Sequence, residues 1–174
     1  DAAQIGGFGA SLGGQTMLLL GGAALTKSPG LSSSPVGADA RIKAAIVLSA
    51  PPFYGEASPQ QILGSIRVPS LHVTATEDII RIPGYYSGAD DRVAVFDATG
   101  SARKTLAVFA GGSHSMFTDR AGSGGAQLNA QVKAATRVLS LAFLNSVFKG
   151  DEAALAAWPG QFAGILARFT RSNP

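Results

Sequence analysis

The stretch Ile5-Gly6-Gly7-Phe8-Gly9-Ala10-Ser11-Leu12-Gly13 decides the fold. Ile5 to Phe8 predicts a short strand, and Leu12 to Leu20 predicts a buried helix. Between them lies the pattern G-x-S-x-G, so Ser11 stands in a sharp turn from strand to helix. A serine in such a turn is held out from the carboxyl edge of a sheet, where it can act as a nucleophile.

The two glycines of this pattern have a steric explanation. A turn this tight strains the backbone of Ser11 and brings neighbouring side chains together, which favours glycine at Gly9 and Gly13. The backbone N–H of Leu12, at the start of the helix, is predicted to face a developing oxyanion. In a chain with 22 glycines the pattern also arises by chance, so its place between strand and helix carries the argument.

Further along the chain, apolar runs alternate with helical stretches. The predicted strands are Ala44–Leu48, Ser70–Thr74 and Lys104–Phe109, and the predicted helices are Pro59–Ile66 and Ala126–Phe148. The segment 27–40 predicts a surface loop, and the segment 84–103 is polar and less periodic. This alternation favours the α/β class, a mostly parallel sheet with helices on both of its faces.

Composition excludes several classes of protein. The 174 residues suffice for one domain with a hydrophobic core. With 46% apolar and 14% charged residues, the chain is not of the disordered class. Its 14 Lys and Arg residues form no dense stripe, which argues against a nucleic-acid-binding surface. No apolar run approaches the ~20 residues that a membrane span requires, so no membrane-spanning helix is predicted.

Metal and cofactor sites are not predicted either. The chain has no cysteine, and its two histidines lack the spacing of a metal site. Residues 9–16 have the spacing of a phosphate-binding loop, but Gln15 stands in place of the lysine that contacts the phosphates.

A serine hydroxyl needs a base to become a nucleophile, and the base needs an acid that orients it. His114 and Asp78 each follow a predicted strand directly. The carboxyl ends of parallel strands share one edge of a sheet, so Ser11, Asp78 and His114 are predicted to meet as nucleophile, acid and base. Glu77 is the alternative acid, expected to point to solvent. The second histidine, His72, lies inside a predicted strand, where we expect it to be packed and hydrogen-bonded.

Four large apolar side chains stand next to loops that should face the serine. They are Phe53, Tyr54, Met116 and Phe117. They either line a substrate pocket or cap the core, and the sequence leaves both alternatives open. The acidic pair Asp90-Asp91 is expected to be solvated.

Most of the chain resembles the carboxyl-terminal half of an α/β-hydrolase, in the branch of dienelactone-hydrolase-like esterases, chlorophyllase-like proteins and bacterial polyester hydrolases. The resemblance rests on the stretches Gly9-Ala10-Ser11-Leu12-Gly13-Gly14, Val47-Leu48-Ser49-Ala50-Pro51-Pro52-Phe53, Val68-Pro69-Ser70-Leu71 leading to Asp78, Gly111-Gly112-Ser113-His114-Ser115-Met116-Phe117 and Phe148-Lys149-Gly150-Asp151-Glu152-Ala153-Ala154. Ser11 replaces the cysteine of true dienelactone hydrolases, which favours ordinary ester cleavage. Ala10 stands where polyester hydrolases often carry Trp or His. Phe53 stands where they tend to carry Trp.

The resemblance implies an α/β-hydrolase fold, of which residues 1–174 look like strands 5 to 8 with their helices, forming part of a single domain. It implies that Ser11, Asp78 and His114 form the catalytic triad of a serine hydrolase that cleaves carboxylic esters through an acyl-enzyme, without a cofactor. It also suggests a secreted or periplasmic bacterial protein. Two alternatives are a depolymerase acting on polyester or polyamide chains and a non-catalytic binding subunit with this fold.

The resemblance further implies a partner. In the family's fold the first half of the sheet precedes the nucleophile, which here is Ser11. We therefore expect the amino-terminal half to come from a companion chain or a further segment. Without it, Ile5 to Phe8 is expected to be an edge strand beside an apolar face. The oxyanion hole would then lack its second donor and have only the N–H of Leu12. Loss of one such donor lowers the rate by a factor on the order of 10²–10³.

Overall fold

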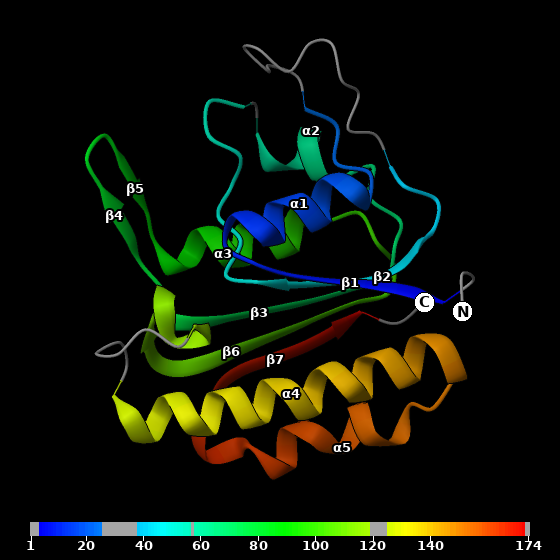
Figure 1. Cartoon of the computed structure of the whole chain (residues 1–174), viewed down its shortest axis with the longest axis vertical. Coiled ribbons are helices and arrows are strands. Elements are labelled where there is room, and N and C mark those ends of the chain that lie inside the picture. Colours follow the sequence, from blue (N-terminus) through cyan, green and yellow to red (C-terminus); the bar gives the residue numbers. More distant parts are fainter. Residues whose placement is uncertain (1–3, 26–37, 57, 119–124, 173–174) are drawn as a thin grey trace.

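The computed structural model describes residues 4–25, 38–56, 58–118 and 125–172. These residues form an α/β structure with a mostly parallel central sheet and helices on both of its faces (Figure 1). Most of the segment 27–40, expected to be a surface loop, lies outside the described residues.

The central sheet has five strands in the order β1-β2-β3-β6-β7. Its strands are β1 (Ile5–Ala10), β2 (Ile42–Leu48), β3 (Ser70–Glu77), β6 (Lys104–Ser113) and β7 (Leu166–Ser172). The first four are parallel to one another, and they confirm the four predicted strands, each longer than predicted. The antiparallel edge strand β7 was not predicted, because it is only half-buried and its sequence shows no clear alternation.

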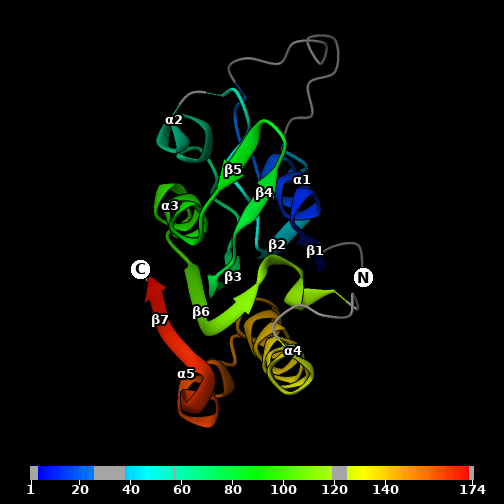
Figure 2. The ribbon, with the colours of Figure 1, turned by 90° about the vertical axis from the view of Figure 1, so that its left-hand side faces the viewer.

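Burial on both faces explains why the predicted strands are continuously apolar. In β2, Ala44, Ile46 and Leu48 pack toward α4, whereas Ala45 and Val47 pack toward α1 and α2. Figure 2 shows the two layers of helices, one on each side of the sheet. One layer holds α1 (Leu12–Leu20), α2 (Pro59–Leu63) and α3 (Ala89–Ala98), and the other holds α4 (Ala126–Lys149) and α5 (Ala153–Gln161).

The segment between β3 and β6 contains elements that the sequence analysis did not predict. A two-stranded hairpin, β4 (Ile80–Ile82) and β5 (Tyr85–Ser87), precedes α3. Its tip is Pro83-Gly84, and Gly84 has a φ of 76°, which a type II turn requires at this position. Pro-Gly between short apolar runs is a recognisable turn signal, so the hairpin was predictable from the sequence.

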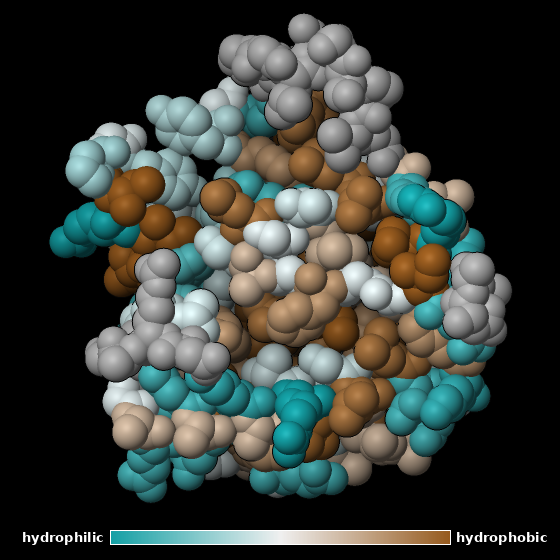
Figure 3. All heavy atoms as spheres, viewed as in Figure 1, coloured by the Kyte–Doolittle hydropathy of each residue, from teal (hydrophilic) through white to brown (hydrophobic). Residues whose placement is uncertain are grey.

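β1 lies at an edge of the sheet, as expected. Among the described strands it pairs with β2 alone. Phe8 of β1 is 62% exposed, and Leu141 of α4 is also exposed. Figure 3 shows apolar surface on this side of the molecule, between α1 and α4. That a further polypeptide covers this edge of the sheet stays a prediction. None of the described helices is both long and apolar enough to span a bilayer.

Candidate active site

Ser11 occupies the turn between β1 and α1 in a strained backbone conformation. Its φ of 54° and ψ of −118° lie where non-glycine residues are rare. A Cβ atom on Gly9 would lie 2.1 Å from the carbonyl oxygen of Gly13, which explains the first glycine. A Cβ atom on Gly13 would meet nothing within 4 Å. The steric explanation is therefore correct for Gly9 and wrong for Gly13, whose side of the turn faces open space.

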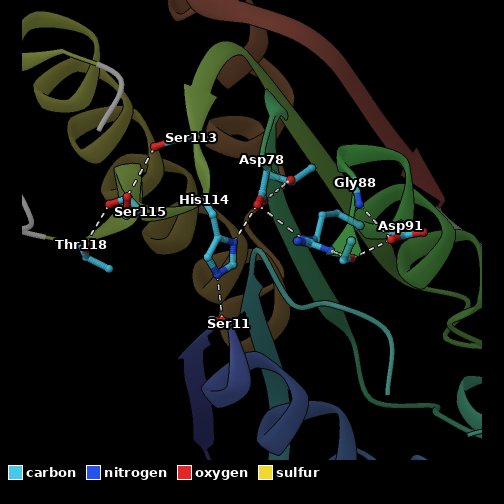
Figure 4. A network of polar contacts seen from close by, with 11 residues as sticks. Ser11, Asp78, Gly88, Asp91, Ser113, His114, Ser115 and Thr118 are labelled. Atoms are coloured by element: carbon cyan, nitrogen blue, oxygen red, sulfur yellow. Dashed lines mark hydrogen bonds and ion pairs between the residues drawn. The ribbon is translucent and has the colours of Figure 1, made fainter. Parts of the chain in front are cut away.

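Three side chains from separate segments meet at the carboxyl edge of the sheet. His114 begins the short 3₁₀ helix η1 (His114–Phe117) that follows β6, and Asp78 directly follows β3. His114 Nε2 lies 2.9 Å from Ser11 Oγ, and His114 Nδ1 lies 2.7 Å from Asp78 Oδ1 (Figure 4). The structure thus brings together Ser11, His114 and Asp78 in the predicted arrangement, while the alternative acid Glu77 is exposed.

Asp78 is fully buried and surrounded by polar groups. The Thr74 hydroxyl donates to Oδ2 at 2.7 Å, and the Arg92 guanidinium lies 3.5 Å from Oδ1. Burial alone would raise the pKa of Asp78, but its contacts with His114, Ser49 and Thr74 and the charge of Arg92 outweigh burial and hold the pKa below its usual range. Asp78 is therefore a carboxylate beside the imidazole, as an orienting acid must be.

His72 lies in the interior, as predicted. It is buried in β3, with Nε2 3.1 Å from Ser70 Oγ and its ring edge-on to Phe96. Burial, together with the nearby charge of Lys104, lowers the pKa of His72 to about 3. His72 is thus a neutral core residue at ordinary pH.

Leu12 is the first residue of α1, so its N–H is one of those without an intrahelical acceptor. The positive end of the helix dipole lies at the same point. This position supports Leu12 as an oxyanion donor, which stays a prediction.

A cleft of about 570 Å³ opens beside Ser11 and His114. Its lining includes the hairpin residues Ile80, Ile82, Pro83, Gly84 and Tyr85, together with Leu12, Gln15, Pro51, Pro52 and Tyr54. Gln15 joins α1 to the segment after β2, because its Nε2 donates to the carbonyl oxygens of Pro51 and Pro52. The described lining contains no Asp, Glu, Lys or Arg, so the cleft suits an uncharged apolar group.

Only one of the four expected lining residues lines this cleft. Tyr54 does, and its ring meets Tyr85 edge-on at 5.6 Å. Phe53 packs against the core beneath α1 and α2, and Met116 is fully buried in the core under α4. Phe117 lines a separate cavity of about 460 Å³ beside Phe8 and α4. Of the two alternatives that the sequence left open, Phe53 and Met116 thus follow the core alternative, and Phe117 lines a cavity other than the cleft beside Ser11.

Among the residues that the structure describes, no group of three His, Asp or Glu side chains is placed to hold a metal ion. Comparison with models of known protein families finds no match to the chain, and a search of curated proteins finds none either.

Proposed function

We propose that the protein is a serine hydrolase of the α/β-hydrolase type that cleaves carboxylic esters. The observation that most supports this proposal is the chain of hydrogen bonds through His114. Its Nε2 lies 2.9 Å from Ser11 Oγ, and its Nδ1 lies 2.7 Å from Asp78 Oδ1. A hydroxyl, an imidazole and a buried carboxylate in this order form the arrangement that activates a serine.

The mechanism follows from the roles of these groups. Ser11 Oγ forms a bond to the ester carbonyl carbon, and His114 Nε2 takes the hydroxyl proton. The Asp78 carboxylate stabilises the imidazolium, and the Leu12 N–H donates to the oxyanion. The bond from the carbonyl carbon to the alcohol oxygen then breaks, and His114 passes its proton to the leaving alcohol. Water cleaves the acyl-enzyme by the same route, which restores Ser11 and releases the acid.

The cleft supports a class of substrate. Its lining is apolar and aromatic apart from Ser11, Gln15 and His114. Charged acyl or alcohol groups would lose their hydration there without gaining a partner, so we propose an ester of an uncharged, apolar acid or alcohol. Tyr54 and Ile82 stand exposed at the mouth of the cleft, which also favours the second candidate, a depolymerase that holds a polymer segment along this rim.

Covalent labelling tests the proposal. A fluorophosphonate probe should add a single label to the protein, and peptide mapping should place it on Ser11. Ser11→Ala should abolish labelling and leave the fold intact, because the change is small and lies in a turn. Ser115→Ala is the matched control, since this serine lies in η1 beside His114 and, among the described residues, its hydrogen bonds are to Ser113 and Thr118. An unlabelled but folded protein would overturn both enzyme proposals and favour the non-catalytic binding subunit.

A panel of p-nitrophenyl esters of increasing acyl length, run beside a polyester film, separates the two enzyme candidates. An esterase should favour an apolar acyl group and leave the film intact. A depolymerase should release soluble products from the film at a rate comparable to its cleavage of small esters. A charged acyl group should slow cleavage in either case.

A further inference from the structure

A buried arginine stands behind the acid of the triad. Arg92 belongs to the first turns of α3 and is 3% exposed. Its Nε lies 3.5 Å from Asp78 Oδ1, the same oxygen that contacts His114 at 2.7 Å. Arginine is almost never fully buried unless it is paired, so this position needs a specific explanation.

The turn before α3 fixes the guanidinium. Arg92 Nη1 donates to Ser87 Oγ at 2.5 Å, and Ser87 Oγ donates to Asp91 Oδ2 at 2.6 Å. Asp91 Oδ2 also accepts the backbone N–H of Gly88, at 3.1 Å. Figure 4 shows Asp78 between His114 on one side and the turn with Gly88 and Asp91 on the other. Asp91, expected to be a solvated charge, instead anchors this turn.

The opposite end of α3 is also anchored. Lys104 Nζ donates to the carbonyl oxygens of Phe96, Asp97 and Thr99, at the carboxyl end of the helix. A cation at this end is favourable because the last carbonyls have no intrahelical partner. With both ends held, α3 presents Arg92 to Asp78 in a fixed position.

The charge of Arg92 has Asp78 as its main counterpart. Among the described residues, Nε and Nη2 of Arg92 find no hydrogen-bond acceptor, so Ser87 is the neutral partner and Asp78 the charged one. The other ionisable groups nearby are His114 on η1, Asp91 on α3 and His72 on β3, which is neutral. Lys104 on β6 lies beyond His72.

We propose that Arg92 is a positioning residue of the triad: its buried guanidinium keeps the Asp78 carboxylate ionised and in place behind His114. The proposal rests on the proposed function for its catalytic consequence, but its electrostatic part is independent of turnover. A cation beside a buried carboxylate favours the charged form of that carboxylate. Removal of the cation therefore lets Asp78 bind a proton at higher pH.

Carbon NMR of the Asp78 carboxyl group measures this effect without reference to activity. The Asp78 signal is assigned by its loss in Asp78→Asn. In Arg92→Gln the titration midpoint of Asp78 should rise by about one pH unit, a Coulombic effect of the size expected for a lost charge at this range. Arg92→Lys keeps the charge and should shift the midpoint by less.

Arg103→Gln is the matched control. Arg103 also bonds to a hydroxyl, that of Ser146, and pairs with Glu152, but it lies at the opposite end of β6 from His114. This variant should leave the midpoint of Asp78 unchanged. A folded Arg92→Gln variant with an unchanged or lowered midpoint would overturn the proposal. A shifted midpoint in a protein that hydrolyses no ester would support the electrostatic role of Arg92 and contradict the proposed function.

A second pair of variants decides the case in which Arg92→Gln fails to fold. The proposal attributes such a failure to an unpaired carboxylate buried at Asp78. Arg92→Gln combined with Asp78→Asn should then recover a folded protein, seen as a cooperative thermal transition. If the double variant is as unfolded as Arg92→Gln alone, Arg92 acts by packing and the proposal is wrong.

Discussion

The two histidines of this protein show how the interior and the carboxyl edge of one sheet use the same side chain differently. His72 lies near the start of β3, packed against Phe96 and hydrogen-bonded to Ser70. His114 lies just past the end of β6 with 24% of its side chain exposed, between a hydroxyl and a carboxylate. Burial without a carboxylate keeps His72 neutral. His114, in contrast, contacts a carboxylate on one side and a hydroxyl on the other.

The strand β3 joins these two environments. It carries His72 inside the sheet and leads, six residues later, to Asp78 at the edge. The residues along a strand thus belong to the core, whereas the residues just past its carboxyl end can belong to a site, because the loops of a parallel sheet meet there. The comparison teaches that the position along the strand, and not the residue type, decides whether a histidine is structural or chemical.

The largest expected effect is that of His114→Ala. Loss of the general base should lower kcat/KM for a p-nitrophenyl ester by roughly 10⁴-fold or more, because Ser11 then has no proton acceptor. The free energy of unfolding should change little, since His114 is part-exposed at a strand end. Steady-state kinetics and thermal denaturation of the same samples measure both quantities. Wild-type turnover in His114→Ala would show that His114 is not the base.

His72→Ala should have the opposite profile. Removal of the buried ring leaves a cavity and an unpaired Ser70 hydroxyl, so the free energy of unfolding should fall by about 2–4 kcal/mol. At a temperature where the variant is folded, kcat/KM should stay within about tenfold of wild type. Chemical denaturation gives the first quantity. If His72→Ala abolished turnover without loss of stability, the assignment of the two histidines would have to be exchanged.

Acid should destabilise the fold through His72. Its pKa is about 3 in the folded protein, against the ordinary 6.5 that we expect when it is unfolded. Between these two pH values the unfolded chain binds a proton at His72 and the folded chain does not. The free energy of unfolding therefore falls as the pH falls from about 6.5 toward about 3, by up to about 1.4 kcal/mol per pH unit.

Urea titrations at several pH values measure this slope, and His72→Gln should flatten it. Asp78 acts in another window, because its lowered pKa gives stability that is present above its unfolded value of 3.8 and lost below it. An equal slope between pH 6 and pH 5 in wild type and His72→Gln would contradict the assignment to His72.

The smallest expected effect concerns the rim of the site. Tyr85→Ala removes one ring of the aromatic pair in the cleft, so KM for an ester with an aromatic acyl group should rise by about fivefold, while acetate esters should be nearly unaffected. Tyr86→Ala is the control, because Tyr86 is the neighbouring tyrosine on the same hairpin but is exposed and lies outside the lining of the cleft, next to Arg81. Equal effects of the two substitutions would show that the hairpin acts only as a scaffold.

The triad was predictable from the sequence because its geometry depends on few variables. Ser11, Asp78 and His114 each follow a strand, and parallel strands bring their carboxyl ends to one edge. The continuous apolar run of β2 likewise predicted burial on both faces. Both inferences use only the periodicity of the chain and the topology of parallel sheets.

Side-chain direction within irregular segments was not predictable. Met116 and Phe117 follow His114 directly, yet the 3₁₀ turn sends them into the core and into another cavity. Arg92 gave no signal either, because a single arginine in a polar stretch is ordinarily solvated, and only the packing of α3 against β3 brings it to Asp78. For the hairpin, the Pro83-Gly84 turn is a signal in the sequence. That the hairpin lines the cleft depends on tertiary structure and could not be predicted.

The hairpin β4–β5 has a consequence for how this protein can change. It forms a sheet of its own, and among the described strands it shares no pairing with the central sheet. Its base is constrained, because Asp78 precedes it and Ser87 ends it. Space surrounds its tip, since a Cβ atom at Gly84 would meet nothing within 4 Å, although the φ of 76° favours glycine at that one position. Evolution or a designer can therefore vary the residues around this turn, and so change the lining of the cleft, while Ser11, His114 and Asp78 stay where they are.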